Sequence, residues 1–213
     1  MKRTSLSGLA ALTVCTALAA QQIEVTFVSP TECEQAHGVY RWDSKTDQEL
    51  PPDTIADANK VKPSDIAQWP PLQGKITMHT PRSGREKDWF EVTGKVVLVR
   101  AEADGDLHIQ LKDADGQSDV MIVVEIPVKQ HPGESPWDEL RTQVFGWSNT
   151  KPPFTLTSDK QLDLAKTPII QVRGKAFFDA MHKGSTPNRR KTDPNVTVWE
   201  IHPVMTLQEV GNP

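Results

Sequence analysis

Three histidines of this chain each follow a carboxylate by two or three residues, in the pairs Asp106–His108, Asp179–His182 and Glu200–His202. Neutral imidazole and carboxylate groups are ligands that suit zinc and other divalent metals. The spacing therefore raises a metal site as the first hypothesis. Whether the pairs can meet depends on the strands that carry them.

The expected strand arrangement argues against one shared metal. His108 alternates with Leu107 and Ile109 and so points away from the core, and His202 does the same on a later strand. These two strands are expected to be separated by a third. Neighbouring strands lie about 4.8 Å apart, so the two outward side chains start roughly 10 Å apart. We therefore expect separate polar histidines, with His182 beside Glu200 or His202 as the pair least affected.

Residues 182–191 form the one strongly basic cluster of the chain. Arg189 and Arg190 are suited to bind phosphate or carboxylate through two parallel hydrogen bonds. The alternative is a solvated hairpin tip. Nucleic-acid binding through this loop is a weaker hypothesis, because single-strand binders stack bases on aromatic residues. The strands expected to face an oligonucleotide offer only His108, Gln110 and Lys112.

Asp104-Gly105-Asp106 resembles the start of the thermonuclease-type OB nuclease site, in which acidic residues hold calcium and arginines hold the phosphate. The sequence then departs from that pattern, because no arginine lies between Arg100 and Arg141. A tight turn between two strands also explains the tripeptide. A metal-dependent, nuclease-like hydrolase is the alternative hypothesis, with Asp104, Asp106, His182 and His202 as metal ligands.

Five β-strands are expected, at residues 89–100, 107–112, 120–126, 169–178 and 196–207. In the second of these strands, apolar and polar residues alternate, as in a half-buried strand. Gly94 and Gly174 lie inside two of the strands and mark a bend or a bulge. A helix that begins at Ser135-Pro136 separates the third and fourth strands.

Three strands, a helix and two strands is the order of the OB-fold. The alternative, an immunoglobulin-like sandwich, needs about seven strands and no helix at this place. We therefore predict a mainly β fold: a five-stranded, OB-fold-like Greek-key barrel with one helix between strands 3 and 4.

The N-terminal part of the chain is expected to contain a targeting segment and a covering segment. Residues 1–19 have the basic start, short apolar run and small-residue cleavage site of a signal peptide. Residues 20–74 are expected to wrap the barrel domain, 75–213, because aromatic residues such as Tyr40 and Trp69 need burial. A short strand at 21–28, in which Ile23, Val25 and Phe27 alternate, is expected at the barrel edge.

Composition and charge set further bounds. The chain has 213 residues, of which 37% are hydrophobic and 24% charged, as in an ordinary single globular domain. Removal of residues 1–19 takes away Lys2 and Arg3 and leaves 22 basic against 28 acidic residues, a formal charge of −6. This charge argues against a general polyanion binder. Cys33 would then be the single cysteine and is expected to be inert.

The chain resembles a family of uncharacterised exported bacterial proteins with an OB-like barrel. The resemblance covers nearly all of the chain after the signal peptide. It is carried by the motifs DGDLHI (104–109), VEIP (124–127), GKAFFD (174–179), NRR (188–190) and WEIHPV (199–204). It implies a single-domain protein in the periplasm or outside the cell, and it assigns no activity to any residue.

The function favoured by the sequence is non-enzymatic binding of a ligand or partner by an exported protein. The site is expected on the face bordered by residues 101–106 and 182–191. A small anionic molecule, a saccharide or another envelope protein fits, with no cofactor, no catalytic residue and no transmembrane anchor. The residues expected to bind are His108, Lys112, His182, Arg189, Arg190 and His202.

Overall fold

A computed structural model describes residues 24–33, 38–129, 131, 133–151, 154–157 and 161–211. The predicted signal peptide, residues 1–19, lies outside these residues. None of the helices in the described ranges is long and apolar enough to cross a membrane.

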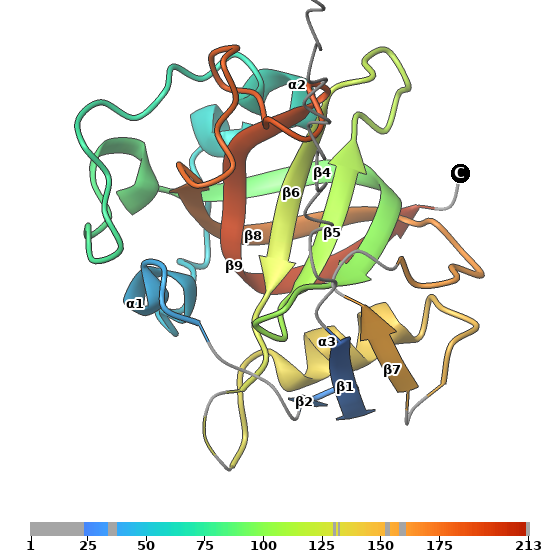
Figure 1. Ribbon diagram of the computed structural model, residues 1–213. Coiled ribbons are helices and arrows are strands. Elements are labelled where there is room, and N and C mark those ends of the chain that lie inside the picture. The colour runs from blue at the N-terminus through green and yellow to red at the C-terminus, as the bar shows by residue number, and fades with distance from the viewer. Residues whose placement is uncertain are drawn as a thin grey trace, which may run out of the picture.

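Strands dominate the structure, and all five predicted strands are present. They are β4 (Trp89–Ala101), β5 (Leu107–Lys112), β6 (Met121–Ile126), β8 (Ile169–Phe178) and β9 (Val196–Gly211). Their pairing runs in the order β4-β5-β6-β9-β8, and a further pairing of β8 with β4 closes the order into a ring (Figure 1). Within the ring, β6 and β9 are parallel and the other neighbours are antiparallel. A mainly β fold is confirmed.

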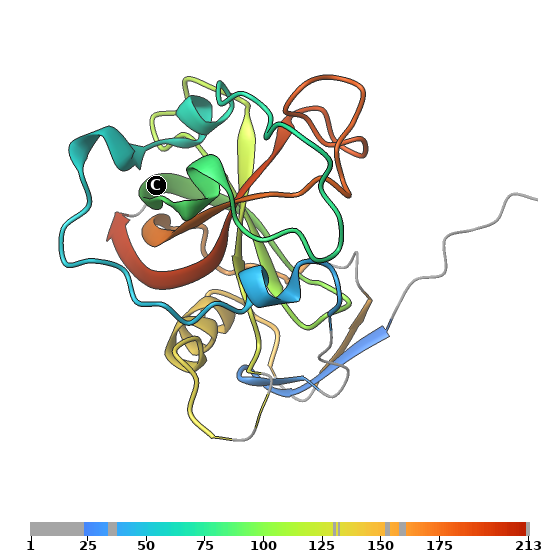
Figure 2. The ribbon, with the colours of Figure 1, turned by 90° about the vertical axis from the view of Figure 1, so that its left-hand side faces the viewer.

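The first strand of the chain does not join this ring. β1 (Glu24–Ser29) pairs with β2 (Glu32–Cys33) and with β7 (Phe154–Thr157) in a separate small sheet. Phe27 of β1 packs against Phe145 of helix α3 (Asp138–Phe145), with ring centroids 5.7 Å apart. The small sheet and α3 lie together at one end of the ring (Figures 1 and 2). The expectation of a strand at the edge of the main sheet was therefore wrong.

Short elements before β4 lie against the ring. They are α1 (Trp42–Lys45), η1 (Asp57–Asn59), β3 (Lys60–Val61), α2 (Pro63–Ile66) and η2 (Gly84–Lys87). β3 pairs in parallel with β4, and Ile66 and Trp69 are buried in the main hydrophobic cluster. Trp69 packs against Phe90 in a tilted arrangement and edge-to-face against Trp199 of the ring, with centroids 4.6 and 5.6 Å apart. This apolar contact explains why the segment folds onto the strands.

The strand β5 is buried on its core face and, at His108, on its opposite face as well. Leu107, Ile109 and Leu111 point into the hydrophobic core, as the alternation predicted. His108 lies on the opposite face of the strand, yet only 1% of its side chain is exposed. Because the imidazole of His108 is buried, its ring nitrogens need hydrogen-bond partners inside the protein.

Two glycines lie where the pairing of the long strands changes, in partner for β4 and in register for β8. β4 pairs with β8 up to Lys95 and with β5 from Lys95 onward, so the change of partner follows directly after Gly94. In β8, the register with β9 shifts on both sides of Gly174. A Cβ atom at residue 174 would lie 2.4 Å from the carbonyl oxygen of Pro203. The predicted irregularity is therefore confirmed at Gly174, where two backbones approach closely, whereas the register shift in β4 lies after Gly94, between Val96 and Leu98.

We expect Gly174→Ala to lower the free energy of unfolding by about 1–3 kcal/mol, because the new methyl group forces two backbones apart. At about 2–4 °C per kcal/mol, the thermal midpoint should fall by roughly 2–12 °C. The matched control is Gly211→Ala, in the partner strand, where an added Cβ would meet Ile169 at an ordinary 3.6 Å. Equal midpoints for the two variants would contradict the prediction.

Candidate functional site

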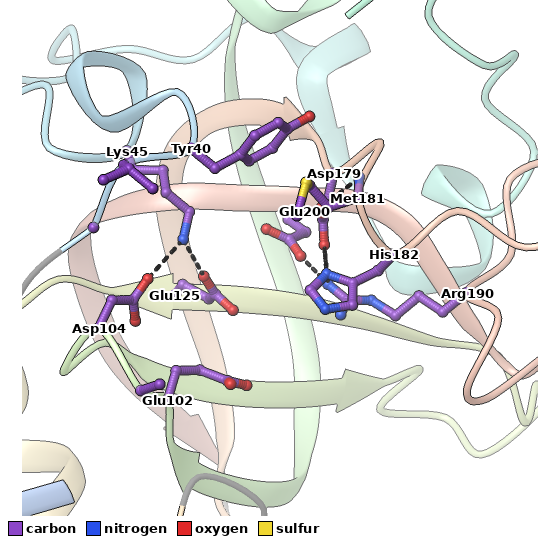
Figure 3. A pocket seen from close by; sticks show the side chains of 13 residues that line it. Tyr40, Lys45, Glu102, Asp104, Glu125, Asp179, Met181, His182, Arg190 and Glu200 are labelled. Atoms are coloured by element: carbon purple, nitrogen blue, oxygen red, sulfur yellow. Dashed lines mark hydrogen bonds and ion pairs between the residues drawn. The ribbon is translucent and has the colours of Figure 1, made fainter. Parts of the chain in front are cut away.

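A pocket of about 320 Å³ opens between two segments that are far apart in the sequence (Figure 3). One wall is formed by residues 102–104, in the turn between β4 and β5, and the opposite wall by residues of the segment 179–190. Residues 38–40 and Lys45 form a third side. The pocket thus lies between the two segments that were expected to border the binding face.

Glu125 of β6 is the central acid of the pocket floor. Its strand lies between β5 and β9, and the register places Glu125 directly opposite His108. Oε1 of Glu125 lies 3.0 Å from Nδ1 of His108, and Oε2 lies 2.8 Å from Nδ1 of His202. All three side chains are buried. One carboxylate therefore contacts both histidines.

Asp106 and His202 also meet, although their strands are not neighbours. Oδ2 of Asp106, directly before β5, lies 3.2 Å from Nε2 of His202 on β9. The expectation that outward side chains two strands apart lie too far from one another for a common site was wrong for this pair. Strand spacing determines the backbone positions, whereas these two side chains extend toward one another across β6.

Two sets of potential metal ligands share Glu125. The first set is Asp106, Glu125 and His202, and the second is Glu102, His108 and Glu125. Within each set, one ligand atom per residue lies within 4.8 Å of the others. The first set is fully enclosed, whereas Glu102 in the second is partly exposed to the pocket.

Lys45 of α1 brings an ammonium group to this cluster. Its Nζ donates a hydrogen bond to Asp104 at 3.0 Å and lies 3.7 Å from Asp106 and 3.9 Å from Glu125. Burial would lower the pKa of Lys45, but the charges of Glu125, Asp106 and Asp104 raise it above its ordinary value. Burial and the charge of Asp106 raise the pKa of Asp104 to about 6.

Charge also shifts the pKa values of the floor residues. Burial would raise the pKa of Glu125, but the charge of His202 and the hydrogen bond with His108 hold it well below its usual value. Burial would lower the pKa of His202, but the charge of Glu125 raises it overall. The floor therefore favours an ionised carboxylate next to a cation.

The opposite wall has its own ion pairs. Arg190 contacts Glu200, lies 3.3 Å from Asp179 and donates to the carbonyl of Thr197 at 3.2 Å. The ring of His182 contacts Asp179 and is half exposed at the pocket. Burial would raise the pKa of Asp179, but His182 and Arg190 lower it below its usual value.

The structure brings some of the predicted site residues together and separates others. His182 and Arg190 line the pocket, and His108 and His202 lie in its floor. Lys112 lies at the other end of β5, opposite Lys95 and Met121. Arg189 donates to the backbone carbonyls of Ala67 and Asn188. Lys112 and Arg189 were expected to bind the ligand, but neither of them lines the pocket.

The structure also brings together only two of the four metal ligands proposed from the sequence. Asp106 and His202 lie together, but Asp104 is paired with Lys45 and His182 with Asp179. The two arginines of the basic loop were expected to hold an anion. Arg190 already pairs with Glu200 and Asp179, whereas Arg189 bonds through Nη1 to backbone carbonyls, so the two arginines do not form a joint anion site.

Sequence reasoning missed Lys45, Glu102 and Glu125 as site residues. Glu125 did have a detectable signature, because a carboxylate inside an otherwise apolar strand is expensive to bury without a partner. Lys45 had none, since it reaches the site through the docking of a segment 59 residues away from Asp104.

Carboxylates outnumber permanent cations at this site. The pocket and its floor contain Glu102, Asp104, Asp106, Glu125, Asp179 and Glu200, against Lys45 and Arg190, and Arg100 outside the pocket pairs with Glu102. Buried charges are stable only when they are paired or bound to a metal. The remaining compensation comes from protonation of Asp104 or His202, whose pKa values are both raised, or from a bound cation. The site can therefore hold a metal ion, and its walls can donate and accept hydrogen bonds.

A buried ion pair holds the third side of the pocket in place. Arg41, at the N-cap of α1, forms two parallel hydrogen bonds to Glu86 of η2, at 2.7 and 2.8 Å, with both side chains fully buried. Arg82 adds contacts through its guanidinium to the carbonyls of Ser44 and His202, at 2.5 and 2.6 Å. These arginines fix the segment that carries Tyr40 and Lys45.

We expect Arg41→Met to lower the free energy of unfolding by about 3–5 kcal/mol, because Glu86 would remain buried without its cation. Denaturant titration measures this loss. Lys60→Met is the matched control, since Lys60 also pairs with a carboxylate but both partners are exposed. We expect the unfolding midpoint of this control to stay close to that of the unmodified protein. A similar loss in both variants would show that burial of the Arg41 pair is not what matters.

No protein-family model, curated protein or solved structure matches this chain. Its function is therefore inferred from the geometry and the charge of the pocket.

Proposed function

We propose that the protein is an exported, OB-fold-like binding protein that takes a small hydroxyl-rich ligand, such as a saccharide, in the pocket between residues 102–104 and 179–190. One observation carries this proposal: charged acceptors and charged donors both line a single concave site. Hydroxyl groups both donate and accept hydrogen bonds, so a polyhydroxylated ligand can use both kinds of wall.

The order of the strands supports the OB-fold part of the proposal. The ring β4-β5-β6-β9-β8, with α3 between β6 and β8, has the strand and helix order of that five-stranded Greek-key barrel. OB proteins bind ligands with the loops between their first and second and between their fourth and fifth strands. The pocket lies between the corresponding segments of this chain. The signal-peptide pattern of residues 1–19 supports export.

The size and the charge of the pocket favour a small neutral ligand over the other candidates. A volume of about 320 Å³ falls at the lower end of the range for small-molecule sites, and an envelope protein would need a broader surface. An anion or a nucleic acid would face Glu102, Asp104 and Glu125. Val39 and Met181 are largely exposed and line the pocket, where they provide apolar contact for a sugar ring.

A metal-dependent hydrolase is the second candidate, because Asp106 and His202 do lie together with Glu125 as potential ligands. In this alternative, the pocket would hold the substrate next to the metal. Turnover of nucleic acid or of a phosphate ester by the metal-loaded protein, lost in Asp106→Asn, would favour this candidate over the binding protein.

The binding proposal is tested with a saccharide panel, screened by thermal shift and measured by calorimetry. A ligand at 100 times its dissociation constant stabilises the folded state by about 2.7 kcal/mol. We expect Glu102→Gln to weaken the binding of such a ligand about tenfold to a hundredfold, because a hydrogen bond to a charged group contributes about 1.5–3 kcal/mol.

The control is Glu139→Gln, an equal change at an exposed residue of α3 outside the pocket, and it should leave the affinity unchanged. If organic amines bind and saccharides do not, the pocket selects cations and the proposed ligand class is wrong. If no member of the panel shifts the midpoint, the proposal fails.

A further inference from the structure

Asp106, Glu125 and His202 form the most enclosed group of potential ligands among the described residues, and we propose that they bind one divalent transition-metal ion of the zinc type. At most 7% of any of the three side chains is exposed. Their ligand atoms lie within 4.8 Å of one another. This site goes beyond the proposed saccharide pocket and does not depend on it.

The polar atoms of two of these residues are buried without hydrogen bonds. Both carboxylate oxygens of Asp106 and both ring nitrogens of His202 have no hydrogen-bond partner in the part of the chain that the structure describes. The contacts at 3.2 and 2.8 Å are close enough for a hydrogen bond but lack its angular geometry. Buried polar atoms are nearly always bonded, so four atoms converging without bonds point to a missing partner.

In contrast to His202, the neighbouring His108 has hydrogen-bond partners for both of its ring nitrogens. Nδ1 of His108 bonds to Oε1 of Glu125 at 3.0 Å, and its Nε2 lies 3.3 Å from the amide nitrogen of Gln110. His108 is therefore satisfied by the protein itself and needs no ion. It also orients Glu125, because the bond to Oε1 leaves Oε2 facing His202. Metal-binding residues are commonly held by a second hydrogen bond of this kind.

His202 is held in position through its backbone. Its carbonyl accepts a bond of 2.6 Å from Arg82, and its ring packs against Phe177 with centroids 5.5 Å apart. A fixed imidazole among carboxylates reduces the cost of ordering the ligands when the ion binds. Mixed imidazole and carboxylate ligands suit zinc and similar ions, whereas calcium and magnesium prefer oxygen alone.

Lys45 is the competing source of positive charge. Its ammonium group lies 3.7 and 3.9 Å from Asp106 and Glu125, beyond hydrogen-bond distance, and is bonded to Asp104 instead. It partly neutralises the two ligands without bonding to them. A divalent ion would add the missing charge directly, and the ammonium group would oppose its binding. Replacement of Lys45 by a neutral residue should therefore increase the affinity for the ion.

The experiment uses the purified protein, prepared without a metal-affinity tag, stripped with a chelator and titrated with Zn²⁺ by calorimetry. We expect about one Zn²⁺ per chain. The cobalt(II)-loaded protein should show visible absorption bands that change when His202 is replaced. Asp106→Asn keeps the shape of the side chain and should weaken Zn²⁺ binding at least about tenfold. Lys45→Met should strengthen it, because a cation close to two ligands is removed.

The matched control is His182→Ala, which removes a half-exposed imidazole from the same pocket without touching the three ligands. It should leave the stoichiometry and the affinity unchanged. Circular dichroism establishes that each variant is folded, and Lys45→Met still tests the site if Asp106→Asn does not fold.

Absence of Zn²⁺ binding by the folded protein would overturn the proposal and identify the cluster as an ion-pair network that needs no metal. Loss of binding in His182→Ala alone would overturn it too, because the ion would then lie at the pocket rim. Failure of the saccharide proposal is distinguishable from failure of this one, because Zn²⁺ is titrated in the absence of any sugar.

Discussion

The need to compensate buried carboxylates is the constraint on which the rest of this structure depends. Glu125 lies inside an apolar strand, and Asp106 is fully enclosed beside it. An isolated carboxylate in such surroundings would become protonated, whereas the pKa of Glu125 is held well below its usual value. Cationic groups must therefore be brought to this place from elsewhere in the chain. His202 of β9, whose pKa is raised by the charge of Glu125, supplies part of the charge, and Lys45 supplies more from outside the ring.

The segment before β4 is thus more than a cover for hydrophobic strands. It buries Trp69 in the core, closes one side of the pocket and places an ammonium group above the acidic floor. Its position rests on guanidinium groups, which bond to Glu86 and to backbone carbonyls of the ring strands. Apolar packing and ionic contacts therefore act on the same segment and fix it in one place.

Local patterns predicted the strands of the ring well, because alternation, turn residues and interior glycines are properties of neighbouring residues. The position of the pocket was also predictable, since the turn after β4 and the loop after β8 border the same face. The partners of individual side chains were not. Arg189 and Arg190 looked like an anion site, but each reaches a group supplied by tertiary contact. The contact between Asp106 and His202 depends on the directions of their side chains, and the spacing between strands does not predict these directions.

The bond from Arg82 to the carbonyl of His202 joins residues 120 positions apart, and His202 belongs to the last strand. A chain made from its N-terminus onward has no complete cluster until β9 is in place. Contacts of such long sequence separation form late, after local turns and hairpins. Whatever binds here therefore acts on a finished fold: it can stabilise the native state by mass action, but it cannot serve as a template for the early steps of folding.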